Sequence, residues 1–403
     1  MFFDPSEKIR EIQQLLISDT KKIGFLFGAG TSLSQKNDRS PNIPAIGKLT
    51  EIILEQLNAQ SYADIILDIK KDIIDNNESF NIETLLSNIE GKIAIIGNGK
   101  LNNLDKNGFV VLQDTIKTLL REIVSVHKNI DETTYNDMAQ CDFGSWVKNA
   151  FRKTAIEIFT TNYDYLIEIG LEQNEIPYYD GFSGSYKPFF NPESVNDLKY
   201  APQQTKLWKI HGSLGLHQDK TTNRITRNAS CQEDLLIYPS ALKYANSKKQ
   251  PYASFMDRLY NFLRQDDSVL FVCGYSFNDE HINERILSAL QTDTTAHVYV
   301  LNYDKANDGT CLFNDSCKLA VLAKQCKKIS ILSARSAIIG AKYGSWKLKR
   351  KPDVEDIANL SLYFAEDPIK DDQWTGEGEL LLIDFAKFAH FLLNMLPVET
   401  SEE

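Results

Sequence analysis

Four short segments of the sequence combine small residues with polar side chains that can bind or activate a substrate. They are residues 28–32 (GAGTS), 160–164 (TTNYD), 209–213 (KIHGS) and 273–279 (CGYSFND). Each follows a short apolar run that has the composition of a buried strand. Because open α/β sheets bind ligands in the crevice beyond the carboxyl ends of their strands, we expect the four segments to share one site.

The first segment is suited to contact with a phosphate group. Gly28, Ala29 and Gly30 are small enough to let the backbone approach a pyrophosphate. The amides of the turn that follows, at Thr31 and Ser32, can face the phosphate oxygens. The third glycine of the dinucleotide-binding pattern G-x-G-x-x-G is absent, since position 33 is leucine. The two glycines could instead serve only a tight turn.

Three side chains offer hydrogen-bonding and acid–base chemistry. Asn162 provides both a donor and an acceptor, and Asp164 provides a carboxylate two residues later. His211, which is followed by a glycine, can take up a proton near physiological pH or hold a sugar hydroxyl. Asn162 or Asp164 could equally be a helix cap at a strand-to-helix junction, and His211 could be an ordinary surface or buried histidine.

The fourth segment and the end of the next strand are suited to the other half of a dinucleotide. Gly274 supplies a second glycine turn, while Ser276 and Asn302 supply polar side chains for a ribose and an adenine. The alternative is a plain strand–turn–helix connection in which Asp279 caps the helix.

Strands and helices must alternate to position these segments. The predicted strands are residues 23–27, 155–159, 206–210, 235–238, 268–273 and 297–301, and the predicted helices are residues 6–18, 163–171, 251–264 and 279–291. This alternation predicts an α/β fold, Rossmann-like, with a mainly parallel sheet. We expect residues 1–44 and 150–330 to form this domain.

Two further regions complete the predicted organisation. Residues 45–149 carry mostly helical patterns and are expected to form a large helical insertion. Residues 331–403 are expected to form a C-terminal helical appendage, which is a possible assembly region, with a helix at 377–395. The apolar side chains clustered on that helix are Phe385, Phe388, Phe391 and Leu392. They could contact another subunit or pack against the chain's own sheet.

Composition excludes several classes of protein. The chain has 403 residues, and 44 basic against 55 acidic side chains give a net charge of −11, which disfavours direct binding to nucleic acid. No secretory signal is visible at the N-terminus, and no apolar run approaches the ~20 residues of a membrane span. Six scattered cysteines are typical of a reducing compartment. We therefore expect a cytoplasmic protein without a membrane partner.

Taken in this order, the segments resemble the sirtuin superfamily over about residues 20 to 305. The resemblance implies NAD as the substrate, with Asn162 orienting a water molecule and the ribose hydroxyls. It also implies that His211 acts as the general base and that Asp164 lies near the carboxamide of nicotinamide. The residues that it implies in NAD binding are Gly28, Ala29, Gly30, Thr31, Ser32, Thr161, Gly274, Ser276 and Asn302.

Departures from the sirtuin pattern narrow the expected activity. Deacylase sirtuins hold zinc with two C-x-x-C pairs, and this sequence contains none, so no metal is expected. The helical insertion resembles the bacterial sirtuin-like branch of antiphage defence proteins, in particular the subunit that works beside a HerA-type ATPase. This resemblance implies an NAD glycohydrolase that depletes NAD in abortive infection, as a homo-oligomer with a HerA-type ATPase partner.

Two other functions remain open. An NAD-dependent protein deacylase or ADP-ribosyl transferase would share the substrate and use a protein acceptor, but the missing cysteine pairs argue against it. A non-catalytic sensor of NAD or ADP-ribose would need neither Asn162 nor His211, and both are present.

Overall fold

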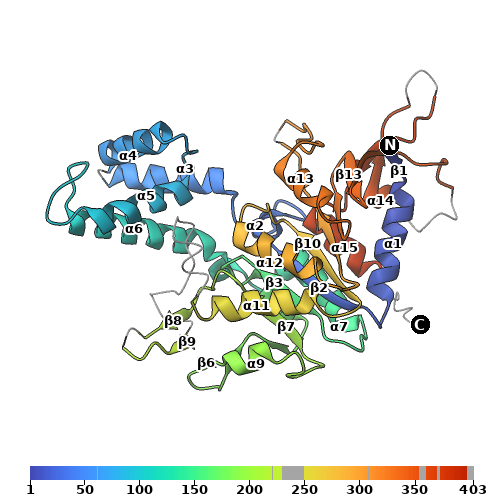
Figure 1. Cartoon of the computed structure of the whole chain (residues 1–403), viewed down its shortest axis with the longest axis horizontal. Coiled ribbons are helices and arrows are strands. Elements are labelled where there is room, and N and C mark those ends of the chain that lie inside the picture. The colour runs from blue at the N-terminus through green and yellow to red at the C-terminus, as the bar shows by residue number, and fades with distance from the viewer. Residues whose placement is uncertain are drawn as a thin grey trace.

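The computed structural model of the chain is built around a ten-stranded sheet (Figure 1), and it describes residues 1–60, 62–219, 221–228, 249–306, 308–353, 360–369 and 373–396. In spatial order the strands are β1 (Phe2–Phe3), β14 (Lys342–Trp346), β13 (Ser336–Ile339), β12 (Ile329–Leu332), β11 (His297–Leu301), β10 (Ser268–Cys273), β2 (Lys22–Phe27), β3 (Glu157–Thr160), β7 (Thr205–Lys209) and β4 (Tyr178–Tyr179). Neighbouring strands are parallel except where β13 pairs with β12 and β14. The predicted α/β fold with a mainly parallel sheet is confirmed, and the strand predicted at 235–238 lies outside the described residues.

The strand order changes direction between β2 and β10. From β2 the chain continues through β3 to β7 on one side of the sheet, and it then returns to β10, β11 and β12 on the other side. Such a switch point leaves a crevice beyond the carboxyl ends of the two central strands. The two glycine segments begin there, since residue 28 follows β2 and residue 274 follows β10.

Helices cover both faces of the sheet because side chains alternate along its buried strands. Phe25 and Phe27 face one apolar core and Leu26 faces the other. The first core includes α1 (Pro5–Ile17), α7 (Ala139–Asn149), α8 (Leu166–Gln173) and α15 (Phe385–Leu393). The second includes α11 (Tyr252–Leu263), α12 (Glu280–Leu290) and α13 (Lys318–Lys324). The result is a three-layer α/β/α arrangement.

The segment between β2 and β3 is helical, and most of it forms a separate lobe at one end of the molecule (Figure 1). Its helices are α2 (Ala29–Leu33), α3 (Ile46–Ala59), α4 (Ala63–Asp75), α5 (Ile82–Ile95) and α6 (Lys106–Val124), then the 3₁₀ turns η1 (Val126–Asn129) and η2 (Tyr135–Asp137), then α7. Side chains of α3 to α6 bury one another in a core of their own. The helix α7 packs on the central sheet instead, so the lobe ends before it.

A second, smaller sheet lies between β4 and α11 in the sequence. Its strands follow the order β5 (Phe182–Ser183), β6 (Phe189–Phe190), β9 (Ile225–Arg227) and β8 (Leu216–Gln218), and all its pairs are antiparallel. The short helix α9 (Pro192–Asn196) follows β6. Strands of two or three residues carry too short a pattern to be predicted from the sequence.

The C-terminal region continues the fold. After β12 the chain adds β13 and β14 to the sheet, followed by α14 (Leu360–Tyr363), β15 (Phe364–Glu366) and β16 (Gly378–Leu380), before α15 begins. The helix predicted at 377–395 therefore begins too early, because α15 starts at Phe385. Asp384 explains the observed start, because its carboxylate accepts hydrogen bonds from the amides of Ala386 and Lys387.

Aromatic side chains of α15 pack against the chain's own sheet. The rings of Phe27 and Phe385 are 5.2 Å apart, and those of Phe25 and Phe388 are 6.3 Å apart. Phe388 and Leu392 are fully buried. Of the two alternatives for this face, packing on the sheet is the one that the structure shows. In the described parts of the chain, no helix combines the length and apolarity that a membrane span requires.

Phe388→Ala tests this packing. Removing a fully buried ring should lower the free energy of unfolding by about 3–5 kcal/mol, measured by chemical denaturation. Lys387→Ala is the matched control, because that side chain is exposed on the same helix and its loss should change stability by roughly 0.5 kcal/mol or less. A Phe388→Ala protein of native stability but altered oligomeric mass would instead make α15 a subunit contact.

Candidate functional site

The two glycine loops cross in direct backbone contact beyond β2 and β10. The Gly30 amide donates a 2.9 Å hydrogen bond to the Gly274 carbonyl. A Cβ atom at Gly28 would lie 2.5 Å from that carbonyl oxygen, and one at Gly30 would lie 2.6 Å from the Gly274 Cα. Gly274 also has φ +64°, a conformation that other residues rarely adopt. The glycines are therefore required by the crossing itself.

This crossing changes what the first loop offers to a phosphate. The Gly30 amide is engaged with Gly274, and the Thr31 amide donates to the Gly28 carbonyl at 2.9 Å. The Thr31 amide is thus engaged inside the loop, and the contact of Thr31 with NAD stays a prediction. Ala29 is exposed at the tip, where a ligand can reach it.

Asn162 fastens the end of β3 to the same loop. Its Nδ2 lies 3.1 Å from the Gly28 carbonyl oxygen, 3.1 Å from Thr31 Oγ1 and 2.9 Å from Ser32 Oγ. A carbonyl can only accept, so the amide must present Nδ2 to Gly28 and turn Oδ1 the other way. Asn162 is buried, and the network holds its amide in one orientation.

Asp164 and Thr161 are also tied into the protein. One carboxylate oxygen of Asp164 accepts from the Ser32 hydroxyl at 2.8 Å, and the other accepts from the Leu166 amide at 3.0 Å. The second bond supports the start of α8, as a capping residue does. The Thr161 amide donates to the Phe27 carbonyl at 3.0 Å, which extends the pairing of β3 with β2. Asp164 thus positions the loop and the helix together.

His211 is brought to the same edge of the sheet by β7. The Ile210 amide donates to the Thr160 carbonyl at 2.8 Å, and the Leu214 amide donates to the Tyr163 carbonyl at 3.0 Å. The turn between these bonds carries His211 and Gly212, whose φ is +88°. His211 is only 3% exposed, so this imidazole sits inside the protein beside the Asn162 segment.

A cavity of about 530 Å³ opens beyond the carboxyl ends of β2, β10 and β11. Its volume is in the range of small-molecule sites. Its described lining residues are Gly30, Leu33, Ser34, Gln35, Gly274, Tyr275, Ser276, Leu301, Asn302, Tyr303, Ile383, Asp384 and Phe385. The structure therefore brings together four of the residues that the resemblance assigned to NAD. The described lining does not include Asn162, Asp164 or His211.

Sequence reasoning missed the part of this cavity that comes from α15. Asp384 accepts a hydrogen bond from the Ser34 hydroxyl at 3.1 Å, and the Ala386 amide donates to Ser34 Oγ at 2.9 Å. These bonds close one wall of the cavity across 350 residues of sequence. The only sequence signal was an aspartate just before an apolar helical pattern, which predicts a helix cap but no position in the fold.

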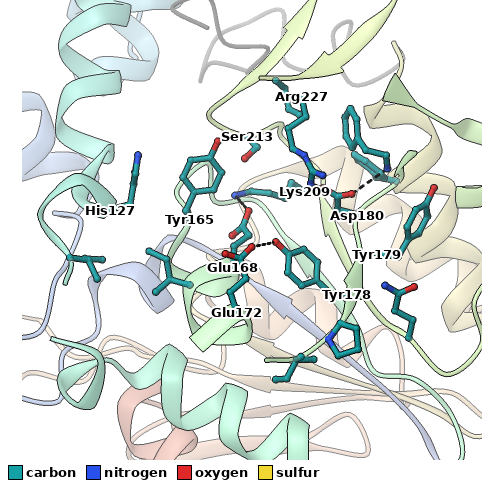
Figure 2. Close-up of a pocket in the computed structure, with 18 of the residues that line it drawn as sticks. His127, Tyr165, Glu168, Glu172, Tyr178, Tyr179, Asp180, Lys209, Ser213 and Arg227 are labelled. Carbon is teal, nitrogen blue, oxygen red and sulfur yellow. Dashed lines mark hydrogen bonds and ion pairs between the residues drawn. The ribbon is translucent and has the colours of Figure 1, made fainter. Parts of the chain in front are cut away.

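A larger cavity of about 920 Å³ has Tyr165, Glu168 and Lys209 among its lining residues (Figure 2). Lys209 forms a 2.8 Å ion pair with Glu168 and also donates to the backbone carbonyl of Tyr163 at 3.3 Å. Burial raises the pKa of Glu168, although the charge of Lys209 opposes that shift. Burial lowers the pKa of His127, which lies at the edge of the cavity nearest the helical lobe. None of these side chains was predicted as a site residue.

The loop crossing can be tested with two glycine substitutions. Gly274→Ala should push the loops apart, because the new Cβ would lie 2.5 Å from the Thr31 amide nitrogen. Gly340→Ala is the matched control, since Gly340 has a similar φ of +57° but open space around it. Both variants carry backbone strain of roughly 1–3 kcal/mol. If NAD binds at this edge, as the resemblance implies, only Gly274→Ala should also weaken its binding by tenfold or more, measured by calorimetry. Equal affinities in the two variants would contradict a role for the crossing in binding NAD.

Comparison with known families supports a sirtuin-like interpretation of this site. Residues 156–320 match the family model described as the SIR2-like domain. The match includes Asn162, His211 and Gly274 and begins after the first glycine loop. No curated protein matches the chain. The β3-to-α13 part of this chain is therefore similar to the SIR2-like domain, and this similarity suggests an NAD-related activity.

Proposed function

We propose that the protein is an NAD glycohydrolase, which cleaves the bond between nicotinamide and ribose to release nicotinamide and ADP-ribose. The observation that carries the proposal is the convergence at the sheet switch point. There the glycine crossing, the buried amide of Asn162 and the buried imidazole of His211 lie at the ends of four adjacent strands, β10, β2, β3 and β7. The SIR2-like match of residues 156–320 supports the choice of NAD.

In this proposal the adenosine half of NAD lies in the 530 Å³ cavity. Ser276 and Asn302 would contact its ribose and adenine, and the tip of the first loop at Ala29 would lie near the pyrophosphate. No lysine or arginine is among the described lining residues. The polar groups that the cavity offers to the nucleotide are therefore hydroxyls, amides and one carboxylate. The carboxylate of Asp384 is better suited to accept hydrogen bonds from the two ribose hydroxyls than to lie beside a phosphate, because two negative charges repel each other.

The reaction needs a group that orients water and a group that accepts its proton. As nicotinamide leaves, the anomeric carbon becomes oxocarbenium-like and is attacked by one water molecule. Asn162 is suited to orient that water, because its Nδ2 is held by the loop and its Oδ1 is turned away from it. His211 would bind a ribose hydroxyl and accept a proton. Asp164, with internal partners on both oxygens, acts as a positioning residue.

Transfer of ADP-ribose to an acceptor is a second candidate. The 920 Å³ cavity favours transfer, because two of its lining residues, Tyr165 and Ser213, follow Asn162 and His211 closely in sequence. An acceptor side chain bound there would compete with water. The two candidates differ only in product: hydrolysis releases free ADP-ribose, and transfer leaves ADP-ribose attached to the acceptor.

We further propose a role in antiphage defence, in which the chain assembles with itself and with a HerA-type ATPase. The support is the resemblance of the helical lobe to that branch of sirtuin-like proteins. Uncontrolled NAD loss would harm the cell that makes the enzyme, so activity should depend on assembly. Light scattering of the protein alone and with the ATPase would measure the complex, and NAD loss in the same samples would show whether assembly controls it.

Substitution of Asn162 or His211 tests the assigned chemistry. Asn162→Ala and His211→Ala should each slow NAD loss by about 10² to 10⁴-fold, because a positioned acid–base or orienting group is removed. Chromatography of nicotinamide and ADP-ribose measures the rate. His217→Ala is the matched control, since His217 lies in β8 of the small sheet, and it should keep the native rate. Native rates in both site variants would refute the assignment.

A further inference from the structure

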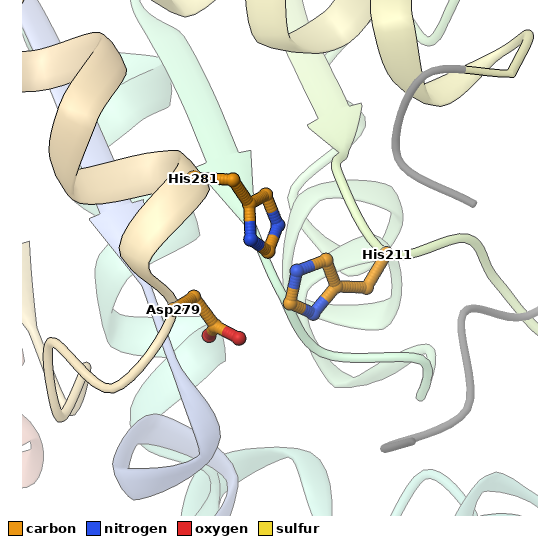
Figure 3. Close-up of side chains that lie close together, drawn as sticks. All are labelled: His211, Asp279 and His281. Atoms are coloured by element: carbon orange, nitrogen blue, oxygen red, sulfur yellow. The ribbon is translucent and has the colours of Figure 1, made fainter. Parts of the chain in front are cut away.

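Three side chains of the kind that bind metal ions lie together at the carboxyl edge of the sheet. His211, Asp279 and His281 point toward one another (Figure 3), and their potential ligand atoms all lie within 4.8 Å of one another. The ring centroids of the two histidines are 5.7 Å apart. One residue of the three belongs to the proposed catalytic pair, so any ion held here would lie at the reaction site.

Two segments far apart in the sequence form this cluster. His211 follows β7, whereas Asp279 and His281 lie at the start of α12, on the face of the sheet opposite α8. Asp279 occupies the N-cap position of α12, and its side chain makes no capping hydrogen bond. Its backbone carbonyl supports the helix, by accepting from the amides of Ile282 and Asn283. The carboxylate instead lies beside the two imidazoles (Figure 3).

The spacing of the cluster is close to that of a metal site. Transition-metal ions bind imidazole nitrogens and carboxylate oxygens at roughly 2.0–2.2 Å, so ligand atoms around one ion lie about 3–4 Å apart. The atoms here lie within 4.8 Å of one another, and small side-chain rotations would bring them to that spacing. The Nε2 atoms of both histidines are shielded from solvent.

We propose that His211, Asp279 and His281 form a binding site for a divalent transition-metal ion, with Zn²⁺ as the best fit. Two imidazoles and one carboxylate favour such an ion over Mg²⁺ or Ca²⁺, which prefer oxygen ligands. Three protein ligands leave at least one coordination position open for water or a ribose hydroxyl. A nitrogen of His211 that binds the ion cannot accept a proton at the same time, so the general-base role proposed for His211 belongs to the metal-free protein. The binding of the ion is tested independently of the proposed function, and only its role at the NAD ribose rests on that function.

Metal titration of the full-length protein tests the proposal. After treatment with a chelator and dialysis, the wild type should bind one equivalent of Zn²⁺ by calorimetry and should not bind Mg²⁺ at comparable concentrations. Asp279→Asn and His281→Gln should each lower the affinity for Zn²⁺ at least tenfold. Glu280→Gln is the matched control, because Glu280 lies between these residues in sequence and pairs with Lys318 on the surface. Circular dichroism would verify that each variant is folded.

Cobalt spectroscopy separates this site from adventitious binding to cysteine. Co²⁺ bound by histidine and carboxylate gives only weak visible bands, whereas a thiolate adds a strong charge-transfer band. Such a band, or equal Zn²⁺ affinity in the wild type and both variants, would overturn the proposal. If Zn²⁺ binds as expected but NAD is not cleaved, the metal site stands and the proposed function fails. If NAD is cleaved but Zn²⁺ does not bind, the proposed function stands and the metal site is refuted.

Discussion

Two glycine loops cross in backbone contact at the point where the strand order of the sheet reverses, and the candidate site depends on this crossing. Gly28, Gly30 and Gly274 approach one another so closely that a single added Cβ would clash with main-chain atoms. The parallel pairing of β2 with β10 brings their ends to one edge, and Gly30 and Gly274 of the crossing line the smaller cavity there. Asn162 is positioned relative to this contact, because its Nδ2 bonds to Gly28, Thr31 and Ser32 of the first loop.

The catalytic candidates are held by the loop rather than by their own strands alone. Asn162 and Asp164 both bond to groups within residues 28–32, so a shift of the loop would move the Asn162 amide with it. Two distant helices stabilise the loop in turn. Gln140 of α7 donates to the Thr31 carbonyl at 2.8 Å, and Ser34 bonds to Asp384 at the start of α15. The position of the loop therefore depends on the packing of α7 and α15.

Much of the sheet could be predicted because its strands are continuous apolar runs that end in glycine or polar residues. The run at 268–273, for example, matches β10 residue for residue. The same pattern correctly predicted that Gly30, Gly274 and Asn302 lie together at the carboxyl edge of the sheet. Asp384 and His281 could not be found this way, because their place at the site arises from tertiary packing. The apolar face of α15 was ambiguous, since an apolar stripe does not say whether it covers a sheet or another subunit.

A crystal structure of the Asn162→Ala protein with NAD tests the central claim most directly, because the impaired enzyme should retain the intact dinucleotide. We predict density for the adenosine half between Gly30 and Asn302, with Asp384 at a ribose hydroxyl and the nicotinamide ribose directed toward His211. Density for NAD in the larger cavity beside Glu168 and Lys209, with the crossing of the glycine loops left unoccupied, would contradict the account.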